Sequence, residues 1–160
     1  ITDGQIFLET ELFHSGIMPA INPGISVSRV GGSAQLKAVK RVSGALKLLY
    51  SQYRELRSFA QFGSDLDADT KSRLALGERI VEVLKQKRNS PVSPGCQVCI
   101  VYAVTNGYLN NVPVEKVGEY EQRLYEKMRS EHSELLARFE AGYFDESDVE
   151  ELKKALSEME

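Results

Sequence analysis

Apolar and polar side chains follow two different periods along this chain, and the change falls near Ser33. Before it, apolar and polar residues alternate over residues 25–28 (Ile-Ser-Val-Ser), which is typical of a strand with one apolar and one polar face. Strand-like sequence covers residues 5–8 and 25–30, with glycines and prolines between them. After Ser33, apolar residues recur every three or four positions, which indicates amphipathic helices.

The first helical pattern begins at Ser33, a suitable N-cap, and closes at Gly63. Because its apolar seam spans only about three heptads, it predicts a helix in a bundle core rather than a coiled coil. The seam consists of Val39, Val42, Leu46, Leu49, Tyr53, Leu56 and Ala60. The turn over residues 63–68 leads into a second helix, which Asp67 should cap. Its inner side should present Leu74, Ile80, Val83 and Leu84.

Three further helices are predicted toward the C-terminus. Residues 88–95 contain two prolines and should break the chain before a short helix over residues 97–105. That helix has little polar face and should be the buried element. A long charged helix over residues 114–139 should end at Gly142, and Asp145 should cap the last helix. The predicted fold is mainly α, a helical bundle preceded by a short β and loop segment.

Composition narrows the function classes. The chain has 160 residues, 27% of them charged, and a formal net charge of −3, which is ordinary for a soluble globular protein. A mildly acidic chain without a basic stripe is not expected to bind nucleic acid. No apolar run approaches the roughly 20 residues that span a bilayer, so no direct membrane insertion is expected. The chain opens on Ile1 within strand-like sequence, and we interpret it as part of a longer protein.

Cysteine and histidine usage indicates no metal site. Cys96 and Cys99 form a Cys-x-x-Cys pair that lacks both the βαβ context of a redox motif and the second ligand pair of a zinc site. We interpret them as two small buried hydrophobes on one helix face, in a reducing compartment. His14 and His132 are isolated in the sequence, one in an N-terminal loop and one in a late helix.

The acidic turn before the second helix resembles the start of a calcium-binding loop. Asp65, Asp67 and Asp69 alternate as in an EF-hand. Thr70 and Leu76 stand where that loop needs glycine and glutamate, which excludes calcium binding of this kind. From the residues alone, the turn caps a helix.

Residues 19–29 (Pro-Ala-Ile-Asn-Pro-Gly-Ile-Ser-Val-Ser-Arg) carry the strongest candidate chemistry. Two prolines and a glycine predict a stiff loop, and Arg29 stands at the end of the strand that follows. The segment contains no acidic residue. A planar guanidinium with five donors suits phosphate recognition. The alternative is an arginine in a surface ion pair, which its chemistry alone favours.

These residues also carry a resemblance. Residues 1–13 (Ile-Thr-Asp-Gly-Gln-Ile-Phe-Leu-Glu-Thr-Glu-Leu-Phe) and residues 19–31 resemble the α subunit of the rotary ATP synthase head. Pro-x-Ile-Asn-x(3)-Ser-x-Ser is the signature that its α and β subunits share. Further matches lie at residues 61–68 and 84–86 and in the acidic helical tail. The resemblance implies an incomplete edge of a nucleotide-binding domain over residues 1–32 and a C-terminal helical-bundle domain over residues 33–160.

The resemblance implies that Arg29 is an arginine finger. In the family this residue projects into the catalytic site of the neighbouring β subunit and stabilises charge on the transferring γ-phosphoryl group. Ser26 belongs to the same signature and is implied to be required for activity. The chain has no Gly-x-x-x-x-Gly-Lys-Ser/Thr phosphate loop, so alone it should neither hydrolyse ATP nor hold a cofactor. The full-length subunit is implied to bind ATP or ADP with Mg²⁺.

A second site is implied around adenine. In the family, Gln-x-Gln lies over the adenine of the nucleotide on α; Gln86 matches it, whereas Arg88 replaces the second glutamine. Arginine can still stack on adenine. Phe13 and Pro19 match residues near that pocket, while Met18 stands where an arginine is common.

The implied partners are the β subunit and the central-stalk γ subunit of an alternating hexameric head, with Asp65 and Asp67 as rotor contacts. The implied complex couples ATP synthesis to proton transport, on the cytoplasmic face of a bacterial inner membrane or the matrix face of a mitochondrial one. The α subunit would be non-catalytic and regulatory within it. The alternative is a self-contained acidic helical scaffold or adaptor for protein partners, which has no reason to carry residues 19–29.

Overall fold

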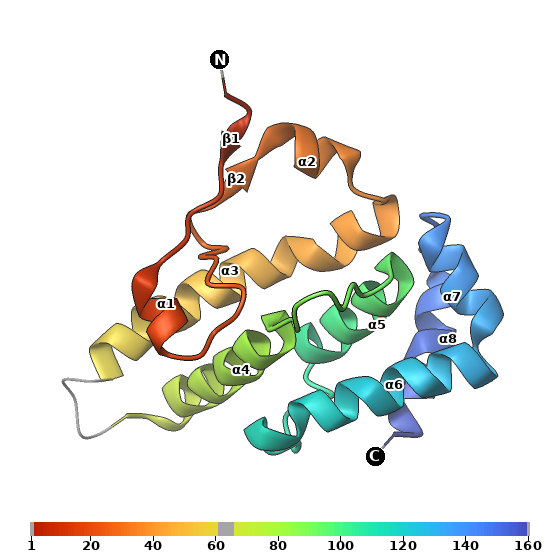
Figure 1. Ribbon diagram of the computed structural model, residues 1–160. Coiled ribbons are helices and arrows are strands. Elements are labelled where there is room, and N and C mark those ends of the chain that lie inside the picture. Colours follow the sequence, from red (N-terminus) through yellow and green to blue (C-terminus); the bar gives the residue numbers. More distant parts are fainter. Residues whose placement is uncertain (1, 61–65, 160) are drawn as a thin grey trace.

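The computed structural model describes residues 2–60 and 66–159, which are mainly helical, as predicted (Figure 1). The strands β1 (Gly4–Gln5) and β2 (Val27–Ser28) pair antiparallel, with Gly4 opposite Ser28. The helices are α1 (Thr10–His14), α2 (Arg29–Ala34), α3 (Lys37–Ala60), α4 (Ala68–Leu84), α5 (Pro94–Thr105), α6 (Val117–Glu131), α7 (Ser133–Glu140) and α8 (Glu146–Ser157), with a 3-10 turn at Val114–Lys116. Within the described residues, no helix combines the length and apolar character that crossing a bilayer requires.

Helix α5 forms the centre of the bundle, which confirms the prediction for the most apolar segment. It contacts α3, α4, α6 and α7. Its buried residues are Gly95, Cys96, Val98, Cys99, Ile100, Ala103 and Val104. The two cysteines are free and fully buried, as predicted, and burial raises the pKa of the Cys99 thiol far above its ordinary range. The helix begins earlier than predicted, because Ser93 caps it and Pro94 occupies the first turn, where no backbone donor is needed.

The residues that begin and end helices α4, α7 and α8 agree with the sequence-based predictions. Asp67 caps α4 by accepting a hydrogen bond from the Thr70 amide at 2.8 Å. Gly142 adopts φ +89° directly after α7, a left-handed conformation that glycine allows. Asp145 forms a capping box with Asp148 at the start of α8.

The helix predicted over residues 114–139 is two helices, and the sequence-based prediction was wrong there. The chain leaves helical geometry at His132, where φ is −128° and ψ is 38°. A continuous helix over that range would be roughly 39 Å long. The break instead lets α6 and α7 both pack against α5, with Leu124, Met128, Leu135 and Phe139 fully or almost fully buried.

The first predicted helix also differs. Ser33 lies inside the short helix α2, so it is not an N-cap, and α3 begins at Lys37 after an extended residue, Gln35. The predicted end at Gly63 falls outside the described residues. The seam is confirmed in part: Val42 and Tyr53 are buried, and Val39, Leu46 and Leu49 are partly buried against the core. Tyr50, which the pattern missed, is buried as well.

Close approach of α3 and α4 depends on a glycine. A methyl group at Gly77 of α4 would lie 2.1 Å from Cδ2 and 2.5 Å from Cβ of the Tyr53 ring side chain, which is itself buried. No neighbouring atom lies within 4 Å of a methyl group at Gly44, on the exposed face of α3. Gly77 therefore permits the close approach of α3 and α4, whereas Gly44 has no such packing role.

We expect Gly77→Ala and Gly44→Ala to have opposite effects on stability. Gly77→Ala should lower the free energy of unfolding by about 1–3 kcal/mol because the core is overpacked. Gly44→Ala should raise it by about 0.5–1 kcal/mol because alanine loses less backbone entropy in a helix. Urea unfolding followed by circular dichroism measures both. Equal effects of the two substitutions would contradict the close approach.

The N-terminal segment is less regular than predicted. The two predicted strands shrink to two residues each, with a further isolated bridge between Leu8 and Ile21. Helix α1 and helix α2 were not predicted. Several apolar side chains of this segment are exposed: Ile6, Leu8, Ile25, Val27 and Val30. In Figure 1 this segment, in red and orange, lies on the α3 side of the bundle, away from the C-terminal helices in blue.

Candidate functional site

The loop that precedes Arg29 is organised by one buried side chain. Asn22 is only 5% exposed, although it is polar. Its Nδ2 donates to Glu9 Oε1 at 2.6 Å, and its Oδ1 accepts from the Gly24 amide at 3.0 Å. Its backbone amide donates to the Phe7 carbonyl at 2.9 Å. A buried polar side chain whose nitrogen and oxygen both have hydrogen-bond partners fixes the loop around it.

Glu9 connects this loop to the helical bundle. While one carboxylate oxygen accepts from Asn22, the other lies 3.0 Å from Arg54 Nη1 on α3. The hydrogen bond from Asn22 and the guanidinium of Arg54 hold the pKa of the Glu9 carboxyl below its ordinary value of 4.5. The side chains of Glu9 and Arg54 are 26% and 36% exposed, so water screens this ion pair only in part.

The two signature serines hold the backbone just before β2 and at its last residue. Ser26 Oγ donates to the Asn22 carbonyl at 2.6 Å and accepts from the Phe7 amide at 3.0 Å. Ser28 Oγ donates to Asp3 Oδ2 at 2.6 Å and accepts from the Gly31 amide at 2.9 Å, which caps α2. Both hydroxyls therefore form hydrogen bonds within the N-terminal segment.

Arg29 occupies the first turn of α2, and its side chain is 83% exposed. Its Nε lies 3.8 Å from Asp3 Oδ1, a distant ion pair on the surface. Asp3 is committed elsewhere, because it accepts hydrogen bonds from Ser28 Oγ at 2.6 Å and from the Val30 amide at 2.7 Å. These hydrogen bonds, led by the one from Ser28, lower the pKa of the Asp3 carboxyl. The guanidinium thus keeps most of its donors available to solvent or to another chain.

Asp3 is the functional neighbour that sequence reasoning missed. Residues 19–29 contain no acid, but the antiparallel pairing of β1 with β2 brings Asp3 beside Arg29. The only available signal was the strand-like sequence on both sides, which did not fix the register. Both interpretations of Arg29 remain compatible with this geometry, since an exposed ion pair is weak.

The residues expected around adenine come together in part. The backbone amide of Gln86 donates to the backbone carbonyl of Met18 at 2.9 Å, which joins the loop before Pro19 to the end of α4. The Gln86 side chain donates to the Ser90 carbonyl at 3.0 Å. Gln86, Arg88, Phe13, Met18 and Pro19 are all exposed. Their role at a nucleotide stays a prediction.

The acidic turn is described only at its end. Asp65 lies outside the described residues. Asp67 accepts hydrogen bonds from the amide and the hydroxyl of Thr70, at 2.8 and 3.0 Å, and these lower the pKa of its carboxyl. This confirms the capping role and leaves the rotor contact as a prediction.

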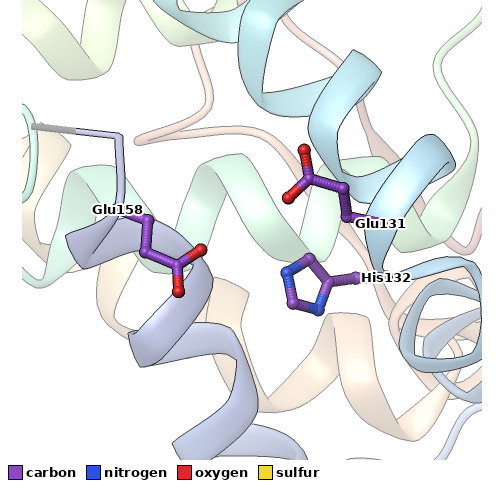
Figure 2. Close-up of side chains that lie close together, drawn as sticks. All are labelled: Glu131, His132 and Glu158. Carbon is purple, nitrogen blue, oxygen red and sulfur yellow. The ribbon is translucent and has the colours of Figure 1, made fainter.

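Three possible metal ligands gather where α6 ends and α8 ends (Figure 2). One ligand atom each from Glu131, His132 and Glu158 lies within 4.8 Å of the others. The Lys127 ammonium already lies between the two carboxylates, 3.0 Å from Glu131 and 2.9 Å from Glu158. His132, isolated in the sequence, is 3.0 Å from a carboxylate oxygen of Glu151. The cluster is an ion-pair network that joins α6 to α8.

We expect the Glu9 carboxyl to titrate with a midpoint below 4.5, because Asn22 and Arg54 favour its charged form. Its contribution to stability is then present above the unfolded pKa and is lost as the pH falls through the lower folded pKa. Carbon NMR titration of the side-chain carboxyl measures this midpoint. The midpoint should rise in Arg54→Gln, and a wild-type value at or above 4.5 would contradict the ion pair.

Comparison with known proteins shows the family that this sequence resembles. The family described as ATP synthase alpha/beta chain, C terminal domain, matches residues 35–159. A relative from Acetobacterium woodii, named "ATP synthase subunit alpha, sodium ion specific", is 58% identical over 138 residues. That match covers 86% of this chain and 28% of the relative, so the chain spans little more than a quarter of the relative's length.

Proposed function

Because the chain belongs to the ATP synthase alpha/beta family, as a C-terminal portion of an α subunit, we propose that it supplies Arg29 in trans to the catalytic site of a neighbouring β subunit. The observation that carries this proposal is the exposure of Arg29 on a braced frame. Its side chain is 83% exposed, while Ser28 and Asp3 fix the backbone from which it projects.

The chemistry follows from the guanidinium. Phosphoryl transfer spreads negative charge over the equatorial oxygens of the γ-phosphoryl group, and a fixed cation stabilises that charge more in the transition state than in the ground state. Arginine offers a planar fork of donors and keeps its charge at all physiological pH values. We propose that the nucleotide on which Arg29 acts is held by the neighbouring β subunit, since these 160 residues contain no phosphate loop.

We also propose that the full-length subunit binds ATP or ADP with Mg²⁺, with Gln86 and Arg88 beside the adenine. In support, the Gln86 amide holds the Met18 carbonyl at 2.9 Å, which brings the loop containing Pro19 to the end of α4. Phe13 lies near the end of α1, in the N-terminal segment that also contains Pro19, and its side chain is exposed. Arg88 would stack on the base rather than repeat the hydrogen bonds of a glutamine.

The proposed assembly is a peripheral membrane complex in which this subunit alternates with β and surrounds a central stalk γ. The proposed rotor contacts are Asp65 and Asp67. The proton of the sequence-based expectation and the sodium ion in the relative's name are both candidates for the coupling ion. We place the complex on the cytoplasmic face of a bacterial inner membrane or its mitochondrial equivalent. The adaptor alternative gains no support from these observations, and we set it aside.

Assembly tests the proposal. The full-length subunit, tagged and co-expressed with its β and γ partners, should co-purify with a β subunit that carries a phosphate loop, and the complex should hydrolyse ATP. The 160-residue chain alone should show no hydrolysis. If the folded full-length subunit purified without β, the proposed assembly with β would be overturned.

A further inference from the structure

Two basic side chains of α3 contact the N-terminal segment that contains Arg29, one through Glu9 and the other at Ser26. Arg54 Nη1 lies 3.0 Å from Glu9 Oε2, and Lys47 Nζ donates to the Ser26 carbonyl at 3.1 Å. Residues seven positions apart lie on one face of a helix. Gly24 fits closely against this face, because a methyl group there would lie 3.2 Å from Ser51 Oγ. One side of α3 therefore supports the whole turn between Asn22 and β2.

The contacts form a continuous path from Arg54 to Arg29. Arg54 holds Glu9, Glu9 accepts from Asn22 at 2.6 Å, and the Asn22 carbonyl accepts from Ser26 Oγ at 2.6 Å. Ser26 is followed by β2, whose last residue caps the helix that begins with Arg29. Because Asn22 is buried and its side-chain nitrogen and oxygen both have partners, a shift of Glu9 should be passed on to the loop before Arg29.

Charge makes Arg54 the decisive support. Glu9 is an acid with only one cation in the described contacts, Arg54, and its side chain is mostly covered. Without that cation, a partly desolvated carboxylate would move toward water and take Asn22 with it. The Lys47 contact is to a neutral carbonyl in an exposed place, so its loss should cost less.

We propose that Arg54 is a positioning residue for Arg29: through Glu9 and Asn22 it sets where the guanidinium projects from the bundle. This inference rests on the proposed role of Arg29 and adds to it a residue that touches neither nucleotide nor phosphate. A finger displaced by about 1 Å loses on the order of 100-fold in rate. The orientation of the helical domain thereby bears on catalysis in the adjacent subunit.

The test uses the assembled complex with four variants: Arg54→Gln, Arg54→Lys, Arg29→Ala and the double variant Arg54→Gln/Arg29→Ala. Arg54→Gln should lower kcat by about 10-fold to 100-fold with KM little changed. Arg54→Lys should recover part of the rate, since it keeps the charge. The double variant should be no slower than Arg29→Ala alone, because the support then has nothing to position.

Arg57→Gln is the matched control. Arg57 lies on the same helix, with its guanidinium 6.0 Å from the Tyr53 ring centre, and should leave turnover near normal. Normal turnover in Arg54→Gln, or a second loss of the same size in the Arg29→Ala background, would overturn the positioning role. Unchanged turnover in Arg29→Ala would overturn the proposed function as well, so the two failures are distinguishable.

Hydrogen exchange gives a readout that does not depend on turnover. In the assembled complex, Arg54→Gln should speed exchange of the Ser26, Val30 and Gly31 amides, which are held by Asn22, Asp3 and Ser28. Arg57→Gln should leave those amides unchanged. Equal exchange in the two variants would count against the path from Arg54 to Arg29.

Discussion

Replacement of Arg29 by alanine in the assembled complex is expected to lower steady ATP turnover by about 10³-fold to 10⁵-fold, the range typical of arginine fingers. The physical reason is that the guanidinium stabilises charge that develops only in the transition state. Affinity of the β site for nucleotide should change far less. Turnover and β-site affinity are measured together on the same preparation.

Lysine at position 29 should restore little of this loss, because an ammonium lacks the planar fork that contacts two oxygens at once. Arg41→Ala is the control, since Arg41 lies 5.9 Å from the Phe144 ring centre on the bundle and should leave turnover near normal. If Arg29 only forms the surface ion pair with Asp3, its removal has little effect on stability and turnover stays normal. Normal turnover in Arg29→Ala would therefore disprove the finger.

Phe139→Ala is expected to lower the free energy of unfolding by about 3–5 kcal/mol, the largest stability effect that we predict. Phe139 of α7 is fully buried, and its ring centre lies 5.5 Å from that of Phe144. Removing the ring leaves a cavity beneath α7. The close-packed core around it is too rigid to close that cavity fully. Urea unfolding of the 160-residue chain, followed by far-ultraviolet circular dichroism, measures the change.

Two controls separate the cavity from simple loss of an aromatic ring. Phe139→Leu keeps most of the volume and should cost less than about 1.5 kcal/mol. Phe59→Ala removes a ring that is 68% exposed on α3 and should stay within about 0.5 kcal/mol of the wild type. A Phe139→Ala protein as stable as Phe59→Ala would contradict the packing of α7 in the core.

Most of the bundle could be predicted because its signals are local. Asp67, Asp145 and Gly142 each act on backbone groups within a few residues, so their capping roles follow from sequence alone. The apolar character of residues 97–105 likewise predicts burial without reference to a partner. The break at His132 had no such signal, since neither glycine nor proline marks it. It follows from packing, because both halves of that segment must cover α5.

The site divides in the same way. The sequence by itself determined the family, the stiff loop and the choice of Arg29 as a candidate functional residue, because each depends on a short run of consecutive residues. Only the tertiary structure decided that Asp3 lies beside Arg29 and that Glu9 pairs with Arg54, which is 45 residues away. Neither contact follows from periodicity, since a period reports which face of an element is buried and not which element covers it. Ion pairs between distant residues form where strand pairing and helix packing happen to bring opposite charges together.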